Sequence, residues 1–260
     1  APWVQDIQVE QDLVISRALI AIFSHTLQKD SLAFRGGTAL YKLHIKPAAR
    51  YSEDIDLVQV RAEPAGPVMD ALRTVLDPWL GAPRWKQTEG RVTLVYRFQS
   101  EDAPPMPLRL KVEINTREHF AVHGFQAAPF SVSSRWFEGE CDIATYDLDE
   151  LLGTKLRALY QRRKGRDLFD LAIALEVGAA NPERIIGAFD VYMKHGGRQV
   201  SRAQFEQNLA AKLLDPTFTA DIGPLLSPGH KWDVEQASGI VARGLIEKLA
   251  GEAWQGGKED

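Results

Sequence analysis

Residues 52–57 read Ser-Glu-Asp-Ile-Asp-Leu, and residues 34–40, upstream of them, read Phe-Arg-Gly-Gly-Thr-Ala-Leu. Side chains two residues apart in a β-strand point to the same side. A strand that begins at Asp54 therefore presents the carboxylates of Asp54 and Asp56 together, with the apolar residues between them turned into the core. Because two carboxylates this close repel each other, the pattern predicts a cation between them. Mg²⁺ fits best, since it prefers oxygen ligands.

A second strand is predicted over residues 108–115, where apolar and polar residues alternate. Glu113 belongs to its polar face. If this strand neighbours the first, Glu113 becomes a third carboxylate, and the group would hold two ions of magnesium or manganese. The alternative is a solvent-exposed strand end with ordinary surface acids, because Asp-x-Asp is a common pattern.

The glycines upstream suggest a site for phosphate. Gly36 and Gly37 allow backbone N–H groups to approach phosphate oxygens closely, and Thr38 adds a hydroxyl group. A helix that starts at Thr38 would favour an anion at its N-terminus. Ser52 is a further candidate for binding a phosphate oxygen, and a plain Gly-Gly turn is the alternative. Glycine loop and acidic strand together predict a nucleoside triphosphate site, although the chain lacks the P-loop pattern.

The composition is that of an ordinary globular protein, with 260 residues, 45% of them hydrophobic, and a net charge of -4. Cys141, the single cysteine, cannot form an internal disulfide, which fits a reducing cytoplasm. No apolar run approaches the roughly 20 residues of a membrane span, and the first residues do not resemble a signal peptide. We therefore expect a cytoplasmic protein with no membrane partner. Any basic surface for a nucleic acid must be local.

The pattern of apolar residues divides the chain into two parts. The front half combines predicted helices with predicted strands, and the back half is helical. The strands are predicted at residues 54–60, 91–98 and 108–115, and the clearest helices at 7–27, 148–160 and 167–176. We therefore predict an α/β (α+β) domain over residues 1–145 and a helical domain over residues 146–260.

Four ordered segments resemble the AbiEii/AbiGii toxin family, within the DNA polymerase β-like nucleotidyltransferase superfamily. They are residues 34–40, 51–57, 155–163 and 166–171. The common form of the superfamily has Gly-Ser where this chain has Gly-Gly-Thr, a variant familiar in this family. The resemblance extends over roughly residues 30 to 175.

This resemblance implies a nucleotidyltransferase core with a mixed β-sheet flanked by helices, and a C-terminal helical domain that contributes to the active site. It also implies a type IV toxin–antitoxin system with a separate antitoxin protein. Some members transfer nucleotides, pyrimidine ones among them, to the 3′ end of tRNA and so block translation. By position, Asp54 and Asp56 would bind metal, Lys155 would contact the triphosphate, and Asp167 or Asp170 would complete the site.

The chemistry of the back half agrees with these assignments but leaves alternatives. Lys155 lies at the edge of the apolar stripe of its helix, where a buried ammonium group requires an anion, unless it reaches water along its stem. Asp167 and Asp170 are three residues apart and share one helix face, so one of them would orient the attacking hydroxyl. Helix capping and a salt bridge with Arg166 are the alternative for the other.

The densest basic stretch is a candidate surface for an RNA backbone. It comprises Arg157, Arg162, Arg163, Lys164 and Arg166. The alternative is a solvated helix face. Two rival functions also remain open: nucleotidyl transfer to a small molecule or a protein side chain, and a non-catalytic scaffold that binds nucleotide or a partner protein.

Overall fold

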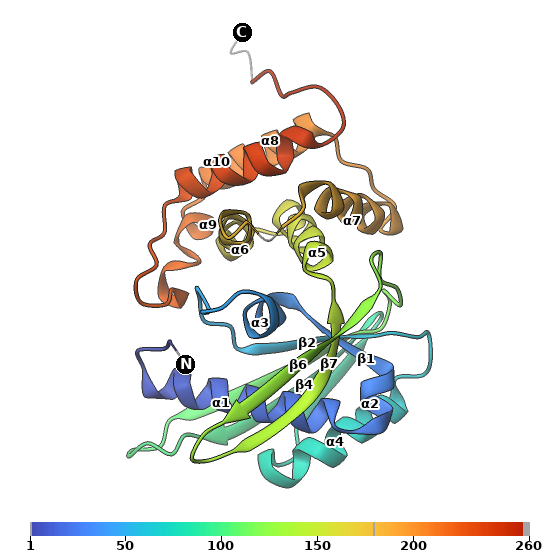
Figure 1. Ribbon diagram of the computed structural model, residues 1–260, viewed down its shortest axis with the longest axis vertical. Coiled ribbons are helices and arrows are strands. Elements are labelled where there is room, and N and C mark those ends of the chain that lie inside the picture. Colours follow the sequence, from blue (N-terminus) through green and yellow to red (C-terminus); the bar gives the residue numbers. More distant parts are fainter. Residues whose placement is uncertain (1, 179, 257–260) are drawn as a thin grey trace. The chain divides into compact units, whose positions relative to one another are not determined.

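The computed structural model describes residues 2–178 and 180–256. The chain divides into two compact units, residues 1–147 and 148–260. The first unit is built on a β-sheet, and the second is made of helices (Figure 1). The predicted α/β class is confirmed.

A single seven-stranded sheet forms the centre of the first unit, in the order β3-β4-β5-β2-β1-β7-β6. Its strands are β1 Leu32–Arg35, β2 Asp54–Gln59, β3 Arg84–Thr88, β4 Arg91–Gln99, β5 Pro107–Asn115, β6 Phe125–Ser133 and β7 Glu138–Tyr146. The sheet is mixed, because β2 pairs with β5 in parallel and β1 with β7 in parallel, whereas the other neighbours are antiparallel.

One face of the sheet carries the core of this unit. Leu110, Val112 and Ile114 alternate along β5 and are fully buried. Three helices cover this face, namely α1 Asp6–Phe23, α2 Thr26–Ser31 and α4 Gly66–Leu80 (Figure 1). The polar residues that alternate with the core positions emerge on the opposite face, as period-two strands require. That opposite face carries the predicted site.

The strands predicted from the sequence are present, and four others were not predicted. β2, β4 and β5 match the predicted strands within about two residues, whereas β1, β3, β6 and β7 were missed. The expected helix at residues 7–27 is α1 and ends at Phe23. The segment after β1 begins its helix at Gly36, not at Thr38, as α3 Gly36–Ala39, and continues as a π-helix over Leu40–His44.

The second unit consists of helices around its own apolar core. They are α5 Leu148–Gln161, α6 Gly165–Glu176, α7 Pro182–His195, α8 Arg202–Leu213, α9 Pro216–Ala220 and α10 Val234–Gly244, with short 3₁₀ turns at Gly223–Leu225 and Ile246–Lys248. The fully buried aromatic side chains in this core are Phe189, Tyr192, Phe205 and Phe218. No helix in the described parts of either unit has the length and apolar character needed to cross a membrane.

Candidate active site

Asp54 and Asp56 lie on the polar face of β2, as predicted. Both are partly buried, and the intervening Ile55 is fully buried. In the parallel pairing of β2 with β5, Asp56 lies opposite Glu113 and Asp54 lies opposite Lys111. The prediction that the two strands are neighbours is therefore confirmed, and it brings Glu113 beside the two aspartates.

Negative charge is concentrated at Asp56. Burial raises the pKa of this carboxyl group, and the neighbouring carboxylates of Asp54 and Glu113 raise it further. The opposing charges of Lys111 and Arg35 only partly offset these effects. An ionised Asp56 is thus destabilised in the folded protein until a cation approaches it.

Lys111 is the counter-ion of this group. Its Nζ atom lies 2.9 Å from Oδ2 of Asp54 and 3.7 Å from Oε2 of Glu113. Burial lowers the pKa of Lys111, but the hydrogen bond and charge of Asp54, with Glu113 and Asp56, outweigh burial and raise it. Arg91 adds a second cation, with Nη1 3.2 Å from Oε1 of Glu113. Sequence reasoning missed both, although Lys111 shares the polar face of β5 with Glu113.

The described residues contain no group of three or more His, Cys, Asp or Glu side chains arranged to hold a metal ion. In this structure the ammonium of Lys111 interacts with Asp54 and Glu113, two of the three carboxylates expected to hold metal, so the metal assignment stays a prediction. The donor set nevertheless fits a divalent cation, since the carboxylates raise one another's proton affinity and supply the hard oxygens that Mg²⁺ prefers. Asp54 and Asp56 are the residues best placed to hold it.

The backbone of Gly36 and Gly37 approaches β2, the strand that carries Asp54 and Asp56. Gly36 has φ 81°, a conformation that favours glycine. A Cβ atom at this position would collide with the carboxylate of Asp56, and one at Gly37 would collide with the guanidinium of Arg50. The first glycine is therefore required on both conformational and steric grounds. It lets the main chain lie directly against Asp56.

The hydroxyl groups of Thr38 and Ser52 are used inside the protein. Thr38 is buried, and its Oγ1 donates to the carbonyl oxygen of Asp54 at 2.5 Å. Thr38 Oγ1 and Ser52 Oγ are 2.8 Å apart. Because the single hydrogen of Thr38 goes to Asp54, Ser52 donates its own to Thr38. Thr38 thus ties the glycine segment to the acidic strand, a contact that residue spacing could not reveal.

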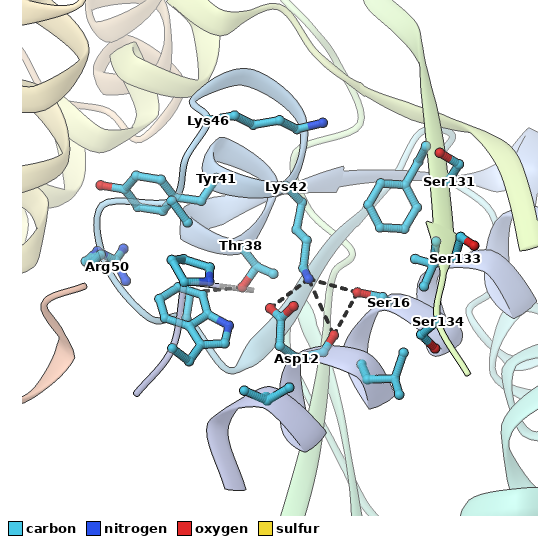
Figure 2. A pocket seen from close by; sticks show the side chains of 18 of the residues that line it. Asp12, Ser16, Thr38, Tyr41, Lys42, Lys46, Arg50, Ser131, Ser133 and Ser134 are labelled. Atoms are coloured by element: carbon cyan, nitrogen blue, oxygen red, sulfur yellow. Dashed lines mark hydrogen bonds and ion pairs between the residues drawn. The ribbon is translucent and has the colours of Figure 1, made fainter. Parts of the chain in front are cut away.

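A cavity of about 410 Å³ lies beside the same segment. Thr38, Arg50 and Ser52 form part of its wall, and it does not include Asp54 or Asp56. Figure 2 shows Lys42 reaching across it to α1, where its Nζ atom lies 2.7 Å from Asp12 Oδ1. Burial lowers the pKa of Lys42, and the charge of Asp12 opposes that effect. A Cβ atom added at Gly37 would face Arg50 and Ser52, which line this cavity, whereas one added at Gly36 would face Asp56.

In the helical domain, Lys155, Asp167 and Asp170 form one buried group. The Nζ atom of Lys155 lies 3.2 Å from Asp167 and 2.7 Å from Asp170, and neither aspartate is exposed. Arg162 binds Asp167 with two nitrogens at 2.6 and 2.7 Å. Although burial raises the pKa of Asp167, the charges and hydrogen bonds of Lys155 and Arg162 lower it overall. The anion that a buried Lys155 requires is therefore present within this domain.

The basic stretch of the helical domain has partners in the same domain. Besides Arg162, Arg163 lies 3.2 Å from Asp215 and Lys164 lies 3.4 Å from Asp221. Arg166 lies 3.9 Å from Asp221, and the guanidinium of Arg157 stacks over the ring of Tyr192. Each cation predicted to bind RNA thus has an acidic or aromatic neighbour that reduces its availability.

A model of a known family matches this chain over residues 17–239, and its description is nucleotidyl transferase AbiEii toxin, type IV TA system. No curated protein matches the chain by sequence.

Two solved structures resemble the fold over most of its length. The nucleotidyltransferase toxin MenT4 from Mycobacterium tuberculosis is 16% identical, with a TM-score of 0.61 over 94% of this chain and 85% of its own. A putative nucleotidyltransferase from H. pylori is 16% identical, with a TM-score of 0.54 over 96% of this chain and 100% of its own. At this identity the likeness concerns the fold alone.

Proposed function

Because the chain belongs to the AbiEii nucleotidyltransferase toxin family of type IV toxin–antitoxin systems, we propose that it transfers a nucleotide to the 3′ end of tRNA. The observation that supports nucleotidyl transfer most directly is that β2 and β5 pair in parallel and bring Glu113 beside Asp54 and Asp56, with the main chain of Gly36 against Asp56. The tRNA acceptor rests on the resemblance of the motifs. Carboxylates beside a glycine segment provide for metal and for phosphate in one place. Such a toxin implies an antitoxin partner.

In the proposed reaction, the acceptor hydroxyl oxygen forms a bond to the α-phosphorus of a nucleoside triphosphate. The bond from this phosphorus to the bridging oxygen breaks, pyrophosphate leaves with that electron pair, and the proton of the acceptor hydroxyl is released to water. Asp54 and Asp56, with Glu113, would hold the magnesium, and the backbone of Gly36 and Gly37 would approach the phosphates. Magnesium, when bound, offsets the charge that develops on the attacking and leaving oxygens.

The helical domain is proposed to complete the site. Lys155 would contact the triphosphate, with its ammonium held in place by Asp167 and Asp170. Asp167 has a lowered pKa and is a poor proton acceptor, so its proposed role is to orient Lys155. Asp170 binds the same ammonium and is the other candidate to orient the acceptor hydroxyl. A pyrimidine nucleotide and a cytoplasmic site of action are further proposals, which rest on the resemblance of the motifs.

The proposal is tested by incubating the protein with each of the four labelled nucleoside triphosphates, magnesium and total cellular RNA. We expect the label to appear on tRNA and to stay on it after protease treatment. Label only on protein or on small molecules would contradict the tRNA acceptor and favour the rival substrates.

Asp56→Asn keeps the size of the side chain and removes the charge that would hold the metal. We expect a loss of about 10³-fold or more, because the charge stabilisation supplied by a metal is worth several kcal/mol. Asp102→Asn, at an exposed loop position of the same domain, is the matched control and should leave transfer intact. Growth inhibition that survives Asp56→Asn would mean that the toxicity does not depend on this chemistry, as expected of a scaffold.

A further inference from the structure

Two rows of side chains cross four strands on the face of the sheet that carries the carboxylates. Paired residues in a sheet emerge on the same face. One row runs through Lys86, Thr93, Glu113 and Asp56, and the other through Arg84, Val95, Lys111 and Asp54. Both rows begin with a cation on the edge strand β3 and end with a catalytic carboxylate on β2.

The cations at the outer end of these rows are exposed and lack acidic partners. Arg84 and Lys86 are exposed, as is Arg97 on β4. Across residues 2–178 and 180–256, no salt bridge or hydrogen bond is found for these three side chains. This distinguishes them from the basic stretch of the helical domain. Unpaired cations are available to replace the counter-ions of a phosphate backbone.

A hollow of about 310 Å³ lies at the outer half of these rows, on β3 and β4. The residues around the hollow are Arg84, Trp85, Lys86, Thr88, Arg91, Thr93 and Val95. Apart from Trp85 and Val95, they are cations or carry hydroxyl groups, and none is acidic. Phosphate oxygens accept hydrogen bonds from side chains of both kinds.

The distance between the two ends of a row argues that the hollow holds a part of a ligand other than the triphosphate. Three strand spacings separate β3 from β2, or about 14 Å at the usual spacing of neighbouring strands. A triphosphate held beside Gly36 and the carboxylates would not need to extend that far. A strand whose 3′ hydroxyl lies at the carboxylates would continue along the sheet and bring its preceding phosphates to the hollow.

We propose that Arg84, Lys86 and Thr93, which we call the edge-strand track, bind the phosphate backbone of the single-stranded 3′ end of the RNA acceptor. This rests on the proposed function, because the carboxylates define where the 3′ hydroxyl must lie. An exposed sheet face with regularly spaced cations suits a single strand, which needs a charged path along its backbone. Sequence-independent contacts of this kind position the strand but do not select it.

The test compares Arg84→Gln/Lys86→Gln with Arg198→Gln/Lys231→Gln, which removes two exposed cations from the helical domain. Both doubles are made in the Asp56→Asn protein, so that RNA binding is measured without catalysis. The ligand is a fluorescent single-stranded RNA that ends in a 3′ hydroxyl, titrated at several salt concentrations. We expect the track double to bind about tenfold more weakly, with the salt slope reduced by about 1.4, or about 0.7 for each lost phosphate contact.

The exchange Arg84→Lys/Lys86→Arg separates charge from folding. It keeps both charges on β3 and should restore binding and the salt slope, whereas a misfolded strand would not be rescued. If Arg84→Gln/Lys86→Gln and Arg198→Gln/Lys231→Gln bound RNA with the same affinity and the same salt slope, RNA binding by the edge-strand track would be contradicted, whatever the transfer assay shows. Failure of the unmodified protein to label any RNA would overturn the proposed function instead, and the binding comparison would still decide on the track.

Discussion

The ammonium of Lys155 lies 2.7 Å from Oδ2 of Asp170, and neither side chain has appreciable access to water. Asp167 binds the same ammonium and also the guanidinium of Arg162. The helical domain therefore contains a buried ionic group that is neutralised within itself. Any loss of activity on changing Lys155 combines an effect on folding with an effect on chemistry, and the two must be separated.

Lys155→Met should lower the free energy of unfolding by about 3–5 kcal/mol, since removal of one partner leaves buried charge uncompensated. Urea unfolding followed by circular dichroism measures this. Lys155→Met/Asp170→Leu removes both members of one pair and should recover a large part of the stability. If the double variant also recovered transfer, Lys155 would have a structural role only. Stability without transfer is expected if the pair takes part in the chemistry, through the ammonium of Lys155 or the carboxylate of Asp170.

Gly36→Ala should destabilise the protein and reduce transfer, because the new Cβ meets the carboxylate of Asp56 in addition to the strain of a positive φ. Gly124→Ala is the matched control, since Gly124 has φ 82° with no atom within 4 Å of an added Cβ. The control should lose about 1–2 kcal/mol from backbone strain alone. Equal losses in the two variants, with transfer retained in both, would show that the contact with Asp56 has no importance.

Thr38→Val should lower the free energy of unfolding by about 1–3 kcal/mol, because it leaves the carbonyl of Asp54 and the hydroxyl of Ser52 without their partner. Thr38→Ser retains the hydroxyl and should recover most of the loss. Thermal unfolding with and without nucleoside triphosphate measures both effects. If valine changed only the affinity for the triphosphate, the hydroxyl would be a ligand rather than a structural tie.

Lys212 should make the free energy of unfolding depend on pH. Its ammonium donates to the carbonyl oxygens of Leu159 and Tyr160 near the end of α5, and burial lowers its pKa to about 8. The unfolded chain keeps this proton up to its ordinary value of 10.5. Between these two values the unfolded state binds more protons, so stability rises with pH. We expect the protein to gain stability relative to Lys212→Met between pH 8 and 10.5 in urea unfolding, and a constant difference would contradict the shift.

The parts of the fold that sequence predicted well are those in which local pattern and burial agree. β5 alternates strictly, and its buried leucine, valine and isoleucine positions were assigned correctly. β3 was missed because all five of its residues are exposed and only its pairing with β4 makes it a strand. An edge strand of this kind has no hydrophobic signal to detect.

At the candidate site, residue types were predictable and their partners were not. The positions of Asp54 and Asp56 follow from strand periodicity. The donation from Thr38 to Asp54 and the approach of Lys111 to the carboxylates depend on side-chain geometry and on the register between β2 and β5. The register between strands is set by the packing of the whole sheet, so it cannot be predicted from a short sequence motif.

The position of Lys111 has a consequence for how the protein exists before it meets a substrate. The ammonium of Lys111 beside Asp54 partly offsets the charge of β2 from within the chain, so part of the repulsion among the carboxylates is relieved before any divalent ion binds. A divalent ion that binds at Asp54 must displace the ammonium of Lys111, which is part of the chain and stays beside the site. If magnesium serves the proposed reaction, its occupancy of this site would therefore depend on the concentration of free metal.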